Sequence, residues 1–146
     1  MNALEKCVDM LVAVVIMFFV PLLFYSAGNH ILQSVSAGEV CENFLKRVST
    51  SGEITLPVWK ELEEGLSRFG CEDFRVRRKY TVWEPGEERG SAVERSYFEE
   101  KDALLEQMRT EGSVGLHKGD SLRVTFYMDD IPTVYYGIVR NEGAAE

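Results

Sequence analysis

Histidine, cysteine and proline are scarce in this chain of 146 residues, which holds two, three and four of them respectively. With His30 and His117 as the only histidines and no C-x-x-C pair, a zinc site is not expected. Asp129 and Asp130 stand in a turn without the regularly spaced ligands of a calcium loop. The sequence contains neither a G-x-S-x-G motif nor a phosphate-binding glycine loop. We therefore predict that the chain is not an enzyme and takes no metal, cofactor or small-molecule substrate.

Positive charge is also in short supply, because 16 basic residues stand against 24 acidic ones and the net charge is −8. Glu5, Lys6 and Asp9 are the charged residues of positions 1–29, so −7 of this charge belongs to positions 30–146. An acidic domain repels the phosphate backbone of DNA and RNA. Nucleic acid is therefore not an expected partner.

Charge is missing altogether from residues 10–29, which read MLVAVVIMFFVPLLFYSAGN. A helix of twenty residues is about 30 Å long, which is the thickness of the hydrocarbon core of a bilayer. The remaining residues are numerous enough for one small domain with a core of its own. The sequence therefore predicts a membrane-spanning segment in residues 1–29 and a single α+β domain in residues 30–146.

A cleaved signal peptide is the alternative interpretation of the apolar segment, with small-x-small cleavage sites ending at Ala27 and Ala37. The segment is long for a signal peptide and one lysine precedes it, so we favour a retained single-pass anchor in membrane lipid. After Lys6, the next Lys or Arg is Lys46. The positive-inside rule then places the N-terminus in the cytoplasm and the C-terminal domain in an extracytoplasmic compartment.

The helix is expected to continue beyond the membrane. Apolar residues between positions 30 and 48 recur mostly at steps of one and three, which is typical of a helix with one apolar face. We predict one long helix over residues 3–47, the second half of which packs on the soluble domain. The alternative is a pair of helices separated near Gly28 and Asn29, where glycine weakens the helix.

Two further helices and four strands are expected in the rest of the chain. Thr55 is a plausible N-cap for the next helix, and Gly70 follows its expected end at Phe69. Alternation of apolar and polar residues predicts the strands, which short turns connect into an antiparallel sheet covered on one face by the helices. The strands are expected over residues 71–83, 92–98, 121–128 and 133–140, and the last helix over residues 99–110.

Arg75, Arg77 and Lys79 alternate along one face of the first predicted strand. They belong to the only dense basic cluster in an acidic chain, and one interpretation is a binding stripe for an acidic partner. The other is a solvated strand face that pairs with nearby acids in residues 84–88. We favour the second interpretation because charged cross-strand pairs are ordinary in sheets.

Two cysteines of the predicted domain, Cys41 and Cys71, lie thirty positions apart. In an oxidising compartment they can form one disulfide. The alternative is a pair of free thiols that are buried as small apolar residues.

A glutamate, a long apolar run, a proline and a tyrosine follow one another at the N-terminus as Glu5, residues 10–29, Pro21 and Tyr25. This pattern resembles that of type IV pilins and pseudopilins, and the layout of the chain is similar to that of small single-helix proteins from tight-adherence pilus loci. The resemblance implies a structural or assembly component of a surface filament or secretion apparatus. It implies that Glu5 neutralises the amino terminus of a neighbouring subunit. The residues implied to pack against the helices of other subunits are Val12, Val15, Phe19 and Leu23.

A second functional hypothesis also includes the membrane anchor, but in it the α+β domain carries out the function. In that hypothesis the chain is an accessory or sensor protein that binds a protein or peptide partner through its sheet. A polymer of many copies favours the pilin-like interpretation, whereas a discrete complex with other proteins favours the accessory one.

Overall fold

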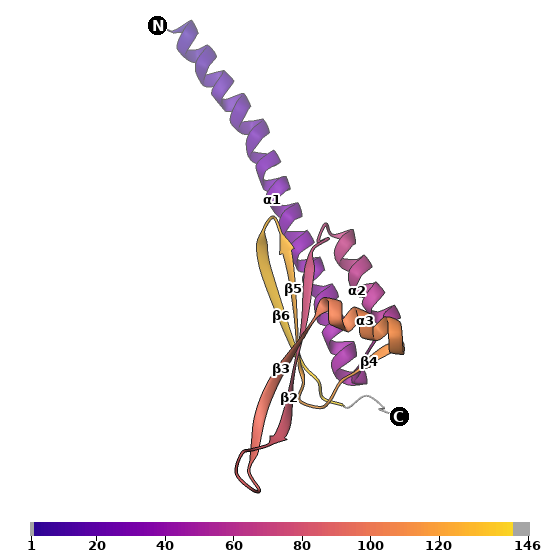
Figure 1. The fold of residues 1–146 in the computed structure, drawn as a ribbon. Coiled ribbons are helices and arrows are strands. Elements are labelled where there is room, and N and C mark those ends of the chain that lie inside the picture. The colour runs from indigo at the N-terminus through magenta and orange to yellow at the C-terminus, as the bar shows by residue number, and fades with distance from the viewer. Residues whose placement is uncertain (1, 142–146) are drawn as a thin grey trace. The chain divides into compact units, whose positions relative to one another are not determined.

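A computed structural model describes residues 2–141 of the chain and divides into two compact units, Met1–Val35 and Ser36–Glu146. Helix α1 (Ala3–Ser51) contributes residues to both units. The second unit is an α+β domain with two antiparallel sheets, one of two strands and one of four (Figure 1). The predicted α+β class and the predicted four-stranded sheet are therefore confirmed.

Helix α1 has helical secondary structure without interruption through Gly28 and Asn29, so the prediction of one long helix is confirmed. It ends at Ser51 instead of near position 47. Within this last turn, the hydroxyl of Thr50 donates to the carbonyl of Lys46, one turn earlier. The helix ends where Gly52 takes a left-handed φ of 72° and its N–H bonds the carbonyl of Val48.

The part of α1 that belongs to the second unit buries one face. The buried positions recur every three or four residues, as expected for a helix that lies against a layer. They are Ala37, Gly38, Cys41, Phe44, Leu45 and Val48.

Helix α2 (Leu56–Arg68) follows the three-residue strand β1 (Glu53–Thr55). Thr55 occupies the N-cap in an extended conformation, and proline lies in the first turn, as predicted. Gly70 has a φ of 80°, which lets the chain leave the helix where the sequence placed its end. Trp59, Leu62 and Leu66 form its buried face.

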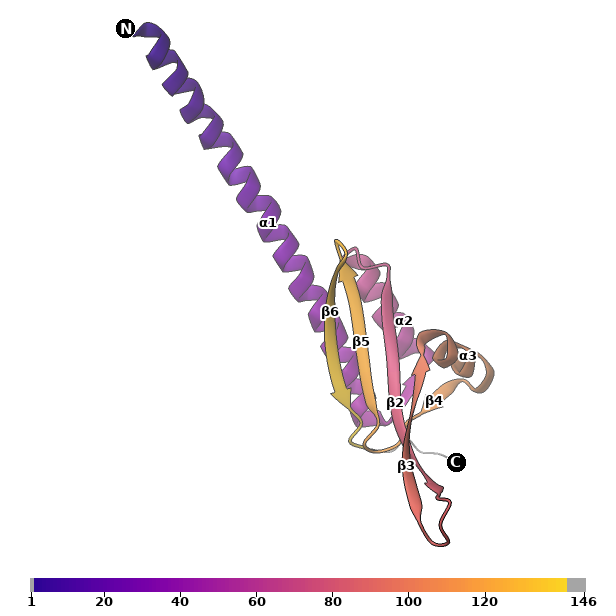
Figure 2. The ribbon, with the colours of Figure 1, turned by 60° about the vertical axis from the view of Figure 1, so that its left-hand side comes forward.

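The main sheet has the strand order β3-β2-β5-β6, with every neighbouring pair antiparallel. Figure 2 shows α2 and the end of α1 on one face of this sheet. Aromatic rings from the three elements meet there, with the centroid of Trp59 6.3 Å from that of Phe44 and 5.8 Å from that of Phe74. The strands are β2 (Phe74–Pro85), β3 (Ala92–Glu100), β5 (Ser121–Met128) and β6 (Ile131–Ile138).

Strand β3 ends two residues later than predicted, and helix α3 (Lys101–Glu111) begins correspondingly later. Ser96 and Glu99 match a helix-capping pattern in the sequence. In the fold the carboxylates of Glu99 and Glu100 bond Arg78 and Arg77 on the neighbouring strand instead. These cross-strand pairs keep both glutamates in the sheet.

The turn between β5 and β6 contains two residues, not the four that the predicted strand boundaries leave between them. Asp129 and Asp130 have φ values of 49° and 63°, which match a type I′ hairpin turn. Aspartate tolerates this left-handed conformation better than most residues do.

The small sheet of β1 and β4 (Ser113–Gly115) was not predicted. Ile54 pairs with Val114 at its centre, and both side chains are buried. Strands of three residues are too short to show a period of two in the sequence.

Candidate interaction surfaces

Residues 10–25 of α1, in the first unit, hold no charged side chain, and their large apolar side chains are exposed on every side of the helix. By length and composition α1 can cross a membrane, although a signal sequence meets the same criteria. The four predicted contact residues are spaced by three or four positions and therefore share one helix face. Their exposed fractions are 46% for Val12, 44% for Val15, 61% for Phe19 and 67% for Leu23. Glu5 is exposed in the first turn of the same helix.

Arg75, Arg77 and Lys79 lie on the face of β2 opposite the buried side chains of Phe74, Val76 and Arg78. Strand β5 brings a fourth cation to this face, because Arg123 is the register partner of Arg77. Like charges directly opposite each other destabilise a sheet. The Arg77 guanidinium is balanced on its other side by Glu100, with 2.6 Å between Nε and Oε1. Among the described residues, Arg123 and Lys79 have no acidic partner.

Aromatic rings lie between the cations of this surface. The Arg77 guanidinium lies 5.4 Å from the centroid of Phe98, and that of Arg75 lies 5.8 Å from the centroid of Tyr127. Tyr136 is the register partner of Arg123 and is 70% exposed. We call this surface the basic sheet face, and it consists of Arg75, Arg77, Lys79, Arg123, Phe98, Tyr127 and Tyr136.

The favoured sequence interpretation, in which acids of residues 84–88 neutralise the stripe, is wrong about the pairs. Glu84 bonds the hydroxyl of Tyr97 and lies 3.2 Å from Arg95. Arg77 pairs with Glu100 instead, on β3. Arg75, Arg77 and Lys79 do lie together on one face, as predicted. This face also contains one cation and three aromatic rings that the predicted stripe did not include. The alternation of residues in β5 and β6 indicates on which side of its own strand Arg123 or Tyr136 lies. It does not show that this side is the one on which β2 carries Arg75, Arg77 and Lys79.

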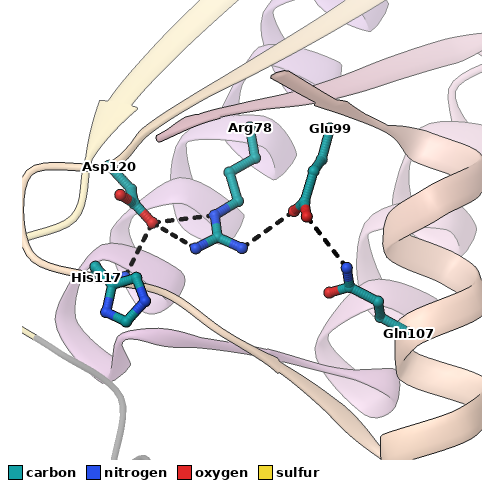
Figure 3. A network of polar contacts seen from close by, with 5 residues as sticks. All are labelled: Arg78, Glu99, Gln107, His117 and Asp120. Carbon is teal, nitrogen blue, oxygen red and sulfur yellow. Dashed lines mark hydrogen bonds and ion pairs between the residues drawn. The ribbon is translucent and has the colours of Figure 1, made fainter. Parts of the chain in front are cut away.

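Behind the basic sheet face lies a buried polar network centred on Arg78 (Figure 3). Its Nε and Nη2 donate to Oδ2 of Asp120 at 3.0 and 2.7 Å, and its Nη1 donates to Glu99 at 3.1 Å. Asp120 also accepts the backbone N–H of His117, and Glu99 accepts from the amide of Gln107. The side chains of Arg78 and Asp120 are 7% and 5% exposed. The network joins β2, β3, α3 and the turn before β5.

Cys41 and Cys71 are buried free thiols in the core of the second unit. Burial raises the pKa of Cys41 to about 12, and the charge of Cys71 adds to this effect. Burial also raises the pKa of Cys71. Since only the thiolate reacts, both cysteines are protected at neutral pH. The disulfide stays a prediction for oxidising conditions.

A groove of about 750 Å³ lies between α1 and β6, within the second unit. Glu42, Lys46 and Tyr135 line it, and the hydroxyl of Ser49 bonds the carbonyl of Ile138 beside it. No group of three or more His, Cys, Asp or Glu side chains that could hold a metal ion occurs within residues 2–141.

Comparison with protein-family models, with curated proteins and with solved structures finds no match for this chain. An assignment of function rests instead on two surfaces of the described residues, the apolar surface of α1 and the basic sheet face.

Proposed function

We propose that this chain is a pilin-like structural or assembly subunit of a surface filament or secretion apparatus, anchored in a membrane by α1. The observation that carries the proposal is the exposed apolar surface of α1. Apolar patches of this extent are covered by lipid or by other proteins, because water solvates them poorly. A helix that is apolar on every side suits a membrane span.

The pilin resemblance gives the N-terminal residues their roles in this proposal. Residues 10–29 cross the membrane, with the N-terminus in the cytoplasm and the domain outside. Glu5, in the first turn of α1, meets the amino terminus of a neighbouring subunit. In lipid, residues 10–29 of neighbouring subunits associate through close side-chain packing, and the ion pair of Glu5 just before this segment aligns the subunits.

Charge reversal at Glu5 tests this role. Glu5→Lys should abolish assembly of the full chain in membranes, because two positive charges then meet where an ion pair is expected. Asp9→Lys is the matched control, since it makes the same change in net charge one helical turn later and should leave assembly largely intact. Copy number would be measured by chemical cross-linking in the membrane. Unchanged ladders for Glu5→Lys would overturn the pilin-like role of the helix.

The basic sheet face supports a second candidate, an anchored accessory or sensor protein that binds an acidic protein or peptide through its sheet. Lys79 and Arg123 favour it, because neither has an acidic partner among residues 2–141. Purification in mild detergent separates the candidates, because a discrete complex of fixed composition supports the accessory protein and polymers support the assembly subunit.

A further inference from the structure

Strands β2 and β3 extend beyond the rest of the main sheet. They pair with each other from Arg77–Glu100 to Pro85–Ala92, whereas β5 pairs with β2 only up to Lys79. Residues 80–97 therefore form a two-stranded arm, which projects past the other strands in Figures 1 and 2. A two-stranded ribbon alone is marginally stable in water, so an arm of this kind gains stability from a surface that covers it.

The arm has apolar side chains exposed on both faces. Trp83 is 67% exposed on the face that β2 shares with Lys79. Val82 and Val93 are 39% and 46% exposed on the opposite face. Inside the arm, Tyr80 stacks on Tyr97 with 5.5 Å between ring centroids. These internal contacts order the ribbon and leave Trp83 available for a partner.

The tip of the arm, residues 84–95, is acidic. It holds four acidic residues and two basic ones, for a net charge of −2. Glu84 pairs with Arg95, but Glu87 and Glu88 are exposed and have no ion-pair partner among the described residues. The basic sheet face has the opposite sign around Lys79 and Arg123, where Glu100 pairs with Arg77. At its other end, acidic residues line a hollow together with Arg75 and Tyr127, namely Glu72, Asp73, Asp129 and Asp130.

We propose that the acidic tip of one copy, with Trp83, docks on the basic sheet face of a second copy. The tip cannot reach the face of its own chain, because β2 runs continuously from the face into the arm. Trp83 supplies a large aromatic anchor, and Tyr136 and Val134 on the face are 70% and 43% exposed. Lys79 and Arg123 receive Glu87 and Glu88, so that the unpaired charges of both surfaces are matched.

The contact is head-to-tail, since the tip and the face are different surfaces of one chain. Repetition of such a contact gives an open series of subunits unless a rotation closes it into a ring. This inference rests on the proposed assembly function and names the contact that would join the domains of neighbouring subunits.

Two charge-reversed variants of the full chain in mild-detergent micelles test the contact by sedimentation velocity. Lys79→Glu/Arg123→Glu reverses the face, and Glu87→Lys/Glu88→Lys reverses the tip. Each should lower the apparent association constant by about tenfold or more, because like charges then oppose each other. An equimolar mixture of the two variants should regain association, since the native tip of the first meets the native face of the second.

The control variant, Lys46→Glu/Lys118→Glu, changes the net charge of the chain by the same amount as Lys79→Glu/Arg123→Glu does. It does so at two exposed lysines outside the basic sheet face. It should associate like the wild type, and unfolding curves of all variants should show that each is folded. Unchanged association in either reversed variant, or no recovery in the mixture, would overturn the contact. If these results occur while Glu5→Lys still abolishes assembly, the proposed function stands without it. A wild-type chain that stays monomeric would contradict both.

Discussion

Arg78 is a buried charged residue whose guanidinium depends on two carboxylates for its charge partners. Its guanidinium is enclosed with two carboxylates, and the Asp120 carboxylate is itself 5% exposed. A buried ion pair adds little net stability, but removal of one partner leaves an unpaired charge in a medium that solvates it poorly. Removal of one partner should therefore lower the stability of the domain by more than the intact network raises it.

Arg78→Met is expected to lower the free energy of unfolding by about 3–5 kcal/mol, because Asp120 then retains only the backbone N–H of His117. Arg75→Met is the matched control on the exposed face of the same strand, and it should change stability by less than about 0.5 kcal/mol. Urea unfolding of the full chain in micelles measures both. Equal effects of the two substitutions would show that the network is not buried in solution.

The three thiols should differ sharply in reactivity. Cys7 is exposed, whereas Cys41 and Cys71 are buried and burial raises the pKa of both thiols. At pH 8 an alkylating reagent should label Cys7 in the folded chain and the other two only after denaturation. Mass spectrometry of the labelled peptides gives the result. If Cys41 and Cys71 stay unlabelled in denaturant until a reductant is added, the predicted disulfide is present. Rapid labelling of Cys41 in the folded chain would contradict its burial.

At the scale of elements, α1 and β6 approach each other closely at a glycine. A Cβ added to Gly38 would overlap the hydroxyl of Tyr135 and crowd its ring. That ring is fixed by stacking on Phe126, with centroids 6.0 Å apart. Glycine at this position lowers the helix propensity of α1, but its lack of a Cβ permits the contact between α1 and Tyr135 of β6.

Gly38→Ala is expected to destabilise the domain by about 1–3 kcal/mol through overpacking, although alanine is the better helix former. Gly115→Ala is a useful comparison, because nothing lies within 4 Å of a Cβ built there. It should have a smaller effect in the same urea unfolding experiment. An increase in stability for Gly38→Ala would mean that Tyr135 moves aside at no cost.

Elements with a strong local pattern could be predicted from the sequence, and those that depend on distant partners could not. The alternation in residues 121–128 predicted β5 with the bounds that the structure has. The extension of β3 depends on Arg77 and Arg78 of another strand, and the small sheet pairs segments that lie about sixty positions apart. Neither property is encoded in a local period.

The same distinction holds for the basic sheet face and the arm. Arg75, Arg77 and Lys79 could be recognised along one strand, but Arg123 and Tyr136 join them only through the registers of β2, β5 and β6. The arm exists because β5 stops pairing with β2 at Lys79 while β3 continues. The lengths over which strands pair are set by the whole sheet.

At the scale of the whole molecule, three surfaces need a partner. In the proposed function the apolar surface of α1 meets lipid and other helices, and in the proposed contact the acidic arm of one copy docks on the basic sheet face of another. A subunit that carries complementary surfaces for its own kind is suited to repetition. An anchored accessory protein would need only one of these surfaces for binding.

The number of copies in one assembly tests this account most directly. The full chain would be extracted from its native membrane in mild detergent, fixed by cross-linking and examined by electron microscopy and mass spectrometry. We predict open-ended assemblies in which copies of this chain repeat, and Glu5→Lys should reduce them to single chains. A discrete complex that contains one copy of this chain beside other proteins would contradict the assembly function and support the accessory one.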